Sequence, residues 1–200
     1  MPHAYPTPEH AEAAEAVVAF FAPRPEVDAV LLICSCARGK ATPDSCLDVA
    51  VLTDPDTDPA PLWNAWKAHH ATEPVFQALR QVGAYANVDL DLTNGILAPD
   101  PDAHGWTTGP DAFELEIGNY LVYSVPLWER NDRFKQLRAT WLPYYDESLR
   151  TERLTMVRRY GLNNLDHIPL YAARGLAFQC LARLQMAARV LVHGQASRAH

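Results

Sequence analysis

The stretch Val27–Asp54 constrains the fold of this chain more than any other part of the sequence. Two short runs of mainly apolar residues, 27–34 and 47–52, are typical of buried strands. Between them lie residues that favour turns and close backbone approach, among them Gly39 and residues 42–45. The pattern predicts a strand, a tight polar turn and a second strand. Asp48 interrupts the second run, and a carboxylate among apolar neighbours is costly to bury unless it is paired, hydrogen-bonded or bound to a metal.

Periodicity predicts the elements that surround this unit. Residues 8–21 should form a helix, and a second helical stretch over 62–82 should be kinked or split at Pro74. Alternation predicts strands over 85–92 and 113–125, the latter as one strand or as two halves bent at Gly118 and Asn119. From residue 131 onward the pattern is helical, with helices expected over 133–142, 146–160 and 170–192, separated at Pro143 and around 161–169. The last of these is apolar on most of its circumference, as in the middle of a helical bundle.

Composition limits the classes of function. The chain has 200 residues, a net charge of −7 and 48% hydrophobic residues, as expected for a globular protein. The acidic balance argues against extended nucleic-acid binding. The basic residues that cluster are expected on a solvated helix face: Arg150, Arg153, Arg158 and Arg159. No apolar run is long enough for a membrane span and no signal peptide is evident, so we expect a cytoplasmic protein that does not bind membranes.

The predicted third strand carries two carboxylates on one face. Its period of two places Asp89 and Asp91 together, opposite the apolar side chains of the same strand. Like charges side by side repel unless a cation lies over them. Either this face is a solvent-exposed edge, or it contributes to a cation site with Asp48. Glu114 and Glu116, in the predicted fourth strand, are further candidates.

Residues 34–52, CSCARGKATPDSCLDVAVL, resemble the signature GSxARGxAxxxSDxDxxV of the nucleotidyltransferase superfamily, which shares the fold of DNA polymerase beta and kanamycin nucleotidyltransferase. The matches keep one register over nearly twenty positions. They fall at Ser35, Ala37, Arg38, Gly39, Ala41, Ser45, Asp48 and Val51. The resemblance implies an α+β fold, with a small mixed β-sheet flanked by helices over residues 1–130 and a C-terminal helical bundle over 131–200.

The resemblance also implies a chemistry. Asp48, Asp89 and Asp91 would be the catalytic and metal-binding carboxylates, and Mg²⁺ (or Mn²⁺) would be held between them and the nucleotide phosphates. The nucleotide, with ATP expected, would lie on the turn and short helix after the first strand. The residues implied for nucleotide binding are Ser35, Cys36, Arg38, Gly39 and Ser45. The protein would transfer a nucleoside monophosphate from NTP to a hydroxyl of a small, antibiotic-like molecule or of a protein.

Two positions depart from the signature. Cys34 stands where the signature has its first glycine, and Cys46 stands where it has the first aspartate of the Asp-x-Asp pair. A thiol is a poor ligand for magnesium. The alternative function is therefore a catalytically impaired nucleotide-binding or interaction protein of the same fold. A third possibility places the function in the helical part, as an interaction module, and an oligomer is possible.

Overall fold

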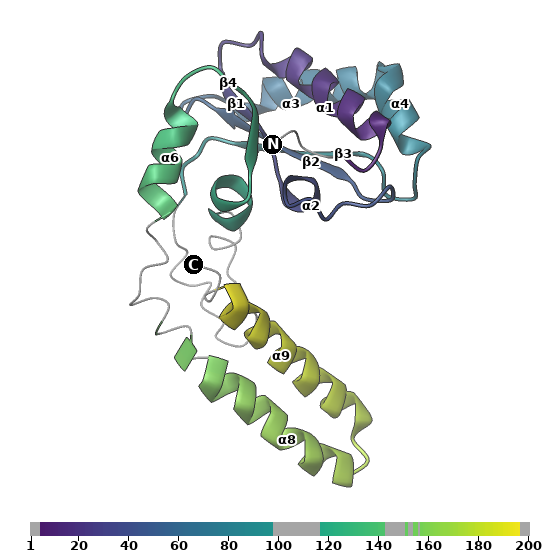
Figure 1. Cartoon of the computed structure of the whole chain (residues 1–200), viewed down its shortest axis with the longest axis vertical. Coiled ribbons are helices and arrows are strands. Elements are labelled where there is room, and N and C mark those ends of the chain that lie inside the picture. The colour runs from purple at the N-terminus through teal and green to yellow at the C-terminus, as the bar shows by residue number, and fades with distance from the viewer. Residues whose placement is uncertain (1–4, 98–116, 143–150, 152–153, 156, 197–200) are drawn as a thin grey trace. The chain divides into compact units, whose positions relative to one another are not determined.

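The computed structural model describes residues 5–97, 117–142, 151, 154–155 and 157–196 (Figure 1). The fold is α+β, as predicted. The chain divides into two units, which we describe separately: Met1–Leu97 with Glu116–Trp141, and Ala98–Leu115 with Leu142–His200. The predicted boundary between residues 130 and 131 stays a prediction. Among the described residues, no helix combines the length and the hydropathy that crossing a membrane requires.

The first unit is built on a mixed sheet with the strand order β3-β2-β1-β4. β1 (Val27–Leu32) pairs antiparallel with both β2 (Leu47–Thr53) and β4 (Val125–Glu129). β2 pairs in parallel with β3 (Val88–Thr93). Because the parallel connection requires a crossover, the chain between β2 and β3 is helical. It forms α3 (Pro59–Thr72) and α4 (Pro74–Arg80).

Both faces of β1 are covered, which explains its continuous apolar run. Val30 and Leu32 belong to the core beneath α1 (Pro8–Phe21), α3 and α4. These three helices cover one face of the sheet (Figure 1). Leu31 faces the other way, toward Leu52 and Phe134, where α6 (Arg133–Trp141) packs. All six residues of β1 are buried, as expected for a central strand.

The helix over 8–21, the strands of the 27–54 unit and the helix near 133–142 are confirmed. The helical stretch expected over 62–82 is split at Pro74 into α3 and α4, as predicted. β3 begins at Val88 rather than at Tyr85, because a turn precedes it in which the Ala86 amide donates to the Gly83 carbonyl (3.2 Å). Tyr85 is 78% exposed.

The prediction of a strand over 113–125 is wrong where the structure describes it. Residues Ile117–Val122 form a π-helix, η1, and the strand β4 follows at Val125–Glu129. The alternation of the sequence ends at Ile117, and the short, mainly apolar run that follows is compatible with a strand or with a helix. Glu114 and Glu116 lie outside the described residues.

The second unit contains η3 (Val157–Gly161), α8 (Leu162–Ala173) and α9 (Ala177–Ala196). α8 and α9 lie side by side as a hairpin (Figure 1). The predicted helix over 146–160 falls largely outside the described residues. Phe178 of α9 is 81% exposed, and Leu181 and Leu184 are exposed as well. The described residues therefore do not bury α9 on all sides, contrary to the expectation of a central bundle helix.

The predicted break around 161–169 is also wrong, since Pro169 lies inside α8. α8 ends instead at Ala173, and Gly175, which adopts φ +68°, lies two residues beyond it, so the helix expected over 170–192 is divided at residues 174–176. The Gly175 amide donates to the Ala172 carbonyl (3.0 Å), and the Leu176 amide donates to the Tyr171 carbonyl (2.9 Å). A left-handed residue that closes the last turn is most often a glycine, because glycine has no Cβ to strain.

An internal ion pair joins α6 to the sheet. Asp28 of β1 is 7% exposed and accepts hydrogen bonds from Arg133 and Asn131, both at 2.6 Å. Arg133 also donates to the carbonyls of Thr53 and Asn94, at the ends of β2 and β3. This network satisfies a buried carboxylate and ties three neighbouring strands to α6.

Asp28→Ala should destabilise the protein by about 3 kcal/mol, because it leaves the partly buried Arg133 guanidinium without its counter-charge. Urea unfolding followed by circular dichroism measures this loss. Lys135→Ala is the matched control, since it removes an ion pair with Asp132 in which both side chains are exposed, and it should change stability little. Equal stability losses in the two variants would contradict the role of the network.

Candidate active site

Three carboxylates lie together on one face of the sheet. In the parallel register, Asp48 of β2 is directly opposite Asp89 of β3, and Asp91 is opposite Ala50. The alternate residues of both strands, among them Val49 and Leu90, point to the core on the other face. Asp89 and Asp91 are exposed and Asp48 is half-buried. The two predicted groups of acids therefore meet on adjacent strands.

Asp48 is in an unfavourable place for a negative charge. Burial raises its pKa above the ordinary value, and the charges of Asp89 and Asp91 raise it further, while a hydrogen bond from Cys46 acts in the opposite direction. In the described part of the chain, no lysine, arginine or histidine pairs with these three acids. Burial and the two neighbouring acids disfavour the charged form of Asp48, and a bound cation would favour it.

The thiol of Cys46 occupies the position next to Asp48 on the same face. Its Sγ donates to Oδ1 of Asp48 at 3.2 Å. Burial raises the pKa of Cys46 to about 12, and the hydrogen bond and charge of Asp48 add to this effect. At neutral pH Cys46 is therefore a neutral hydrogen-bond donor, and it supplies neither the charge nor the oxygen ligand of an aspartate.

A short helix, α2 (Cys34–Ala37), begins directly after β1, beside the carboxylates. The Ile33 amide before it donates to the Asp48 carbonyl at 3.0 Å, which fixes this turn to β2. The pKa of Cys34 is raised to about 11, mainly by burial, and the charges of Asp48, Asp91 and Asp89 contribute to the rise. The start of α2 and the three acids thus share one small region. Gly39, with φ +63°, follows the helix.

The residues predicted to bind nucleotide differ in their surroundings. Ser35 lies in the first turn of α2 and is half-buried. Cys36 is buried, and its Sγ lies 3.6 Å from the Cys46 carbonyl, so its side chain faces the protein interior. Arg38 is exposed; its Nε donates to the Cys34 carbonyl (3.1 Å), and its guanidinium lies 5.8 Å from the ring centroid of Tyr123. Arg38 thus contacts the backbone of its own turn and the ring of Tyr123, and Cys36 contacts the backbone of Cys46.

Ser45 stabilises the turn before β2 through a hydrogen bond. Its Oγ accepts from the Thr42 amide at 2.9 Å, and its carbonyl lies 2.9 Å from Nε2 of the buried His10. Thr42 and His10 are therefore the contacts that the structure shows for Ser45, and a role in binding nucleotide stays a prediction.

The structure adds one residue that the sequence did not single out. Tyr120 of η1 donates its hydroxyl to Oδ2 of Asp91 at 3.1 Å. The residue lies in the segment predicted to be a strand, and no local sequence signal places it over β3. Of the two acids on β3, Asp91 is thus held by a tyrosine, while Asp89 is the direct neighbour of Asp48.

The side chains of Asp48, Asp89 and Cys46 differ in how well they suit magnesium as ligands. Among the described residues, no three histidine, cysteine or acidic side chains form a ready-made metal cluster. Magnesium, however, is usually bound by one or two carboxylates together with waters and substrate phosphates. Asp48 and Asp89 supply hard oxygen donors of that kind, whereas the protonated thiol of Cys46 does not. The residues present therefore fit a magnesium ion that a nucleotide helps to hold.

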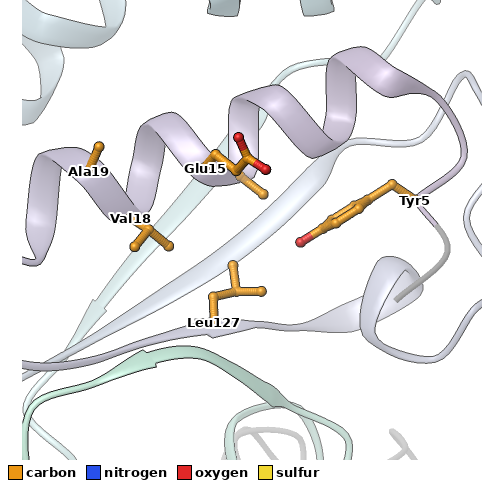
Figure 2. Close-up of a pocket in the computed structure, with 6 residues that line it drawn as sticks. Tyr5, Glu15, Val18, Ala19 and Leu127 are labelled. Carbon is orange, nitrogen blue, oxygen red and sulfur yellow. The ribbon is translucent and has the colours of Figure 1, made fainter. Parts of the chain in front are cut away.

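A separate pocket lies between α1 and β4, with a cavity volume of about 340 Å³. Figure 2 shows Tyr5, Glu15, Val18, Ala19 and Leu127 around it. The pKa of Tyr5 is raised, mainly by burial and then by the charges of Cys36 and Glu15. None of the predicted site residues lines this pocket, so it is distinct from the carboxylate site.

Comparisons with known proteins leave the family open. No protein-family model and no curated protein matches the chain. The solved structures that are similar include one described as a toxin-antitoxin with AMP-PNP and one of a mutant of the toxin-antitoxin MntA-HpeT. The sequence identities are 15% and 16%, each with a TM-score of 0.41. Each match covers 72% of this chain, and 95% and 94% of the respective other chain. Similarity at this level does not assign a function.

Cys34 has φ +53°, in the left-handed region that a side chain with a Cβ occupies at a cost. Cys34→Gly should therefore be more stable than Cys34→Ala by about 1 kcal/mol, because both variants lose the thiol and only glycine relieves the backbone strain. The comparison is made by urea unfolding at neutral pH. An alanine variant as stable as the glycine variant would show that the turn at position 34 is not strained.

Proposed function

We propose that the first unit is a divalent-cation-dependent nucleotidyltransferase. It would transfer a nucleoside monophosphate from an NTP, with ATP expected, to a hydroxyl of a small molecule or of a protein. The observation that carries this proposal is the register that places Asp48 directly beside Asp89, next to the turn and helix that bear the signature residues. A pair of unneutralised carboxylates beside a potential phosphate-binding turn is what this reaction requires.

The residues of the site would divide metal binding, phosphate contact and proton transfer between them. Asp48 and Asp89 would hold magnesium, which neutralises phosphate charge when it is bound. The first amides of α2 have no acceptor within the helix, and together with Ser35 and Gly39 they would contact phosphate. The acceptor oxygen would attack the α-phosphorus, and pyrophosphate would leave. Asp89 of β3 would also take the acceptor proton.

The register favours Asp89 over Asp91 as the carboxylate that would bind metal together with Asp48. It lies opposite Asp48, whereas Asp91 lies two residues further along β3 and already accepts the hydroxyl of Tyr120. Asp91 and Tyr120 would then fix the rim of the site and the position of η1. This assignment separates two acids that the sequence leaves equivalent.

The direct test uses the full chain with NTPs labelled at the α-phosphate, Mg²⁺ or Mn²⁺, and a panel of hydroxyl acceptors. The wild type should form labelled product. Asp48→Ala and Asp89→Asn should each lower the rate by about 100-fold or more, since several kcal/mol of charge stabilisation are lost. Asp91→Asn should lower it less. Asp56→Asn removes an exposed loop acid and should have no effect.

Absence of product from the wild type with every nucleotide, metal and acceptor would count against transfer. Equal activity of Asp48→Ala and the wild type would do so as well, because the carboxylate pair would then have no part in the reaction.

The hydrogen bond from Cys46 to Asp48 favours a second candidate, a nucleotide-binding protein of the same fold without turnover. Cys46→Asp restores the first aspartate of the Asp-x-Asp pair in the signature, and the transfer assay together with a measurement of Mn²⁺ affinity separates the two functions. A wild-type enzyme should change little or lose activity, because its site is adapted to the thiol. A protein that has lost turnover should instead gain metal affinity from the added carboxylate.

A further inference from the structure

Residues 157–196 of the second unit carry a net positive charge, whereas the whole chain is acidic. Residues 157–196 contain a single acidic residue, Asp166, in a protein whose net charge is −7. The same segment contains five arginines, namely Arg158, Arg159, Arg174, Arg183 and Arg189. A segment with this excess of arginine attracts anions even though the protein as a whole is acidic.

A cavity of about 330 Å³ lies within this unit, between η3, α8 and α9. Its lining includes Tyr160, Asn164, Tyr171, Arg183 and Met186. This volume is at the lower end of the range for small-molecule sites, which commonly combine apolar and aromatic walls with a few fixed polar groups. We call it the Arg183 cavity.

The guanidinium of Arg183 is held in place by a buried amide. Its Nη1 donates to Oδ1 of Asn164 at 2.7 Å, and Asn164 is only 2% exposed. Nδ2 of the same amide donates to the Tyr160 carbonyl at 2.9 Å. Because both ends of the amide are engaged, its orientation is determined, and it fixes one edge of the guanidinium.

Arg183 is half-buried and pairs with no acid among the residues that the structure describes. Its contacts there are the neutral amide of Asn164 and the ring of Tyr171, whose centroid lies 5.8 Å from the guanidinium carbon. A guanidinium has five N–H donors. Removing this cation from water without a counter-charge is unfavourable, and a phosphate or carboxylate that accepts two N–H groups would compensate.

We propose that the Arg183 cavity binds a small aromatic anion, with its phosphate or carboxylate on Arg183 and its ring against the tyrosine and methionine side chains. An aromatic ring gains from such a wall through stacking and apolar contact. A recessed arginine in a cavity of this volume suits one small anion better than an RNA chain, which would use the exposed Arg158 and Arg159. This site is independent of the nucleotide site proposed for the first unit.

Isothermal titration calorimetry of the full-length protein with phenyl phosphate, benzoate and phenol tests the proposal. Phenyl phosphate and benzoate should bind with one-to-one stoichiometry, and phenol should bind at least about tenfold more weakly because it lacks the anionic group. Arg183→Gln should weaken binding of both anions by about tenfold or more. Arg158→Gln removes the same charge from an exposed residue outside the cavity and should leave binding unchanged. None of these probes is a nucleotide, so the outcome does not depend on the first unit.

Equal affinities of Arg183→Gln and the wild type would overturn the proposal. Equal weakening by Arg158→Gln and Arg183→Gln, with displacement of phenyl phosphate by a single-stranded RNA oligonucleotide, would assign the surface to nucleic acid instead. Should Arg183→Gln fail to fold, hydrogen exchange on the wild type decides. Phenyl phosphate should slow amide exchange in peptides that cover 160–186, and unchanged exchange there would refute the site.

Discussion

The parallel pairing of β2 with β3 is the constraint on which the candidate site depends. It sets Asp48 against Asp89 and sends the alternate side chains of both strands into the core. A shift of one residue in this register would place the acids in the core and the valines in water. The hydrophobic face of the sheet therefore fixes the position of the carboxylates, and the unfavourable charge at Asp48 follows from the same packing. A cation is the simplest partner for such a pair of acids.

Cysteines modify this site at two points. Cys34 adopts a left-handed conformation where the signature has glycine, and Cys46, which donates a hydrogen bond to Asp48, stands where the signature has the first aspartate of its pair. Both thiols have raised pKa values and remain protonated at neutral pH. The site thus keeps the geometry of strand, turn and helix, but it has less negative charge than the signature provides. In the proposed function, Asp48 and Asp89 would be the principal oxygen donors for a metal.

Much of the first unit could be predicted because its signals are local. Pro23 and Pro25 mark the end of α1, Pro74 marks the split between α3 and α4, and apolar runs mark β1 and β2. The strand expectation fails over 117–122 because the alternation of 113–117 does not continue there. IGNYLV is a short, mainly apolar run, which periodicity alone assigns neither to a strand nor to a helix. In the second unit, the break expected around 161–169 is wrong because α8 continues through Pro169 to Ala173, and the positive φ of Gly175 closes its last turn.

The candidate site could be predicted only in part. The signature named Asp48, and alternation placed Asp89 and Asp91 on one face. The choice between those two acids required the register of β3 against β2, which is a tertiary contact. The hydrogen bonds from Tyr120 to Asp91 and from Arg183 to Asn164 likewise join residues of different elements. Contacts of this kind leave no periodic trace in the sequence.

Binding of Mn²⁺ in the presence of a non-hydrolysable NTP, followed by electron paramagnetic resonance, tests the central claim most directly, because it does not require the acceptor to be known. We expect the wild type to bind the ion, and we expect Asp48→Asn and Asp89→Asn each to weaken binding by about tenfold or more, as the loss of a charged ligand should. Mn²⁺ affinity that is the same in the wild type and in both variants would contradict a cation site between β2 and β3.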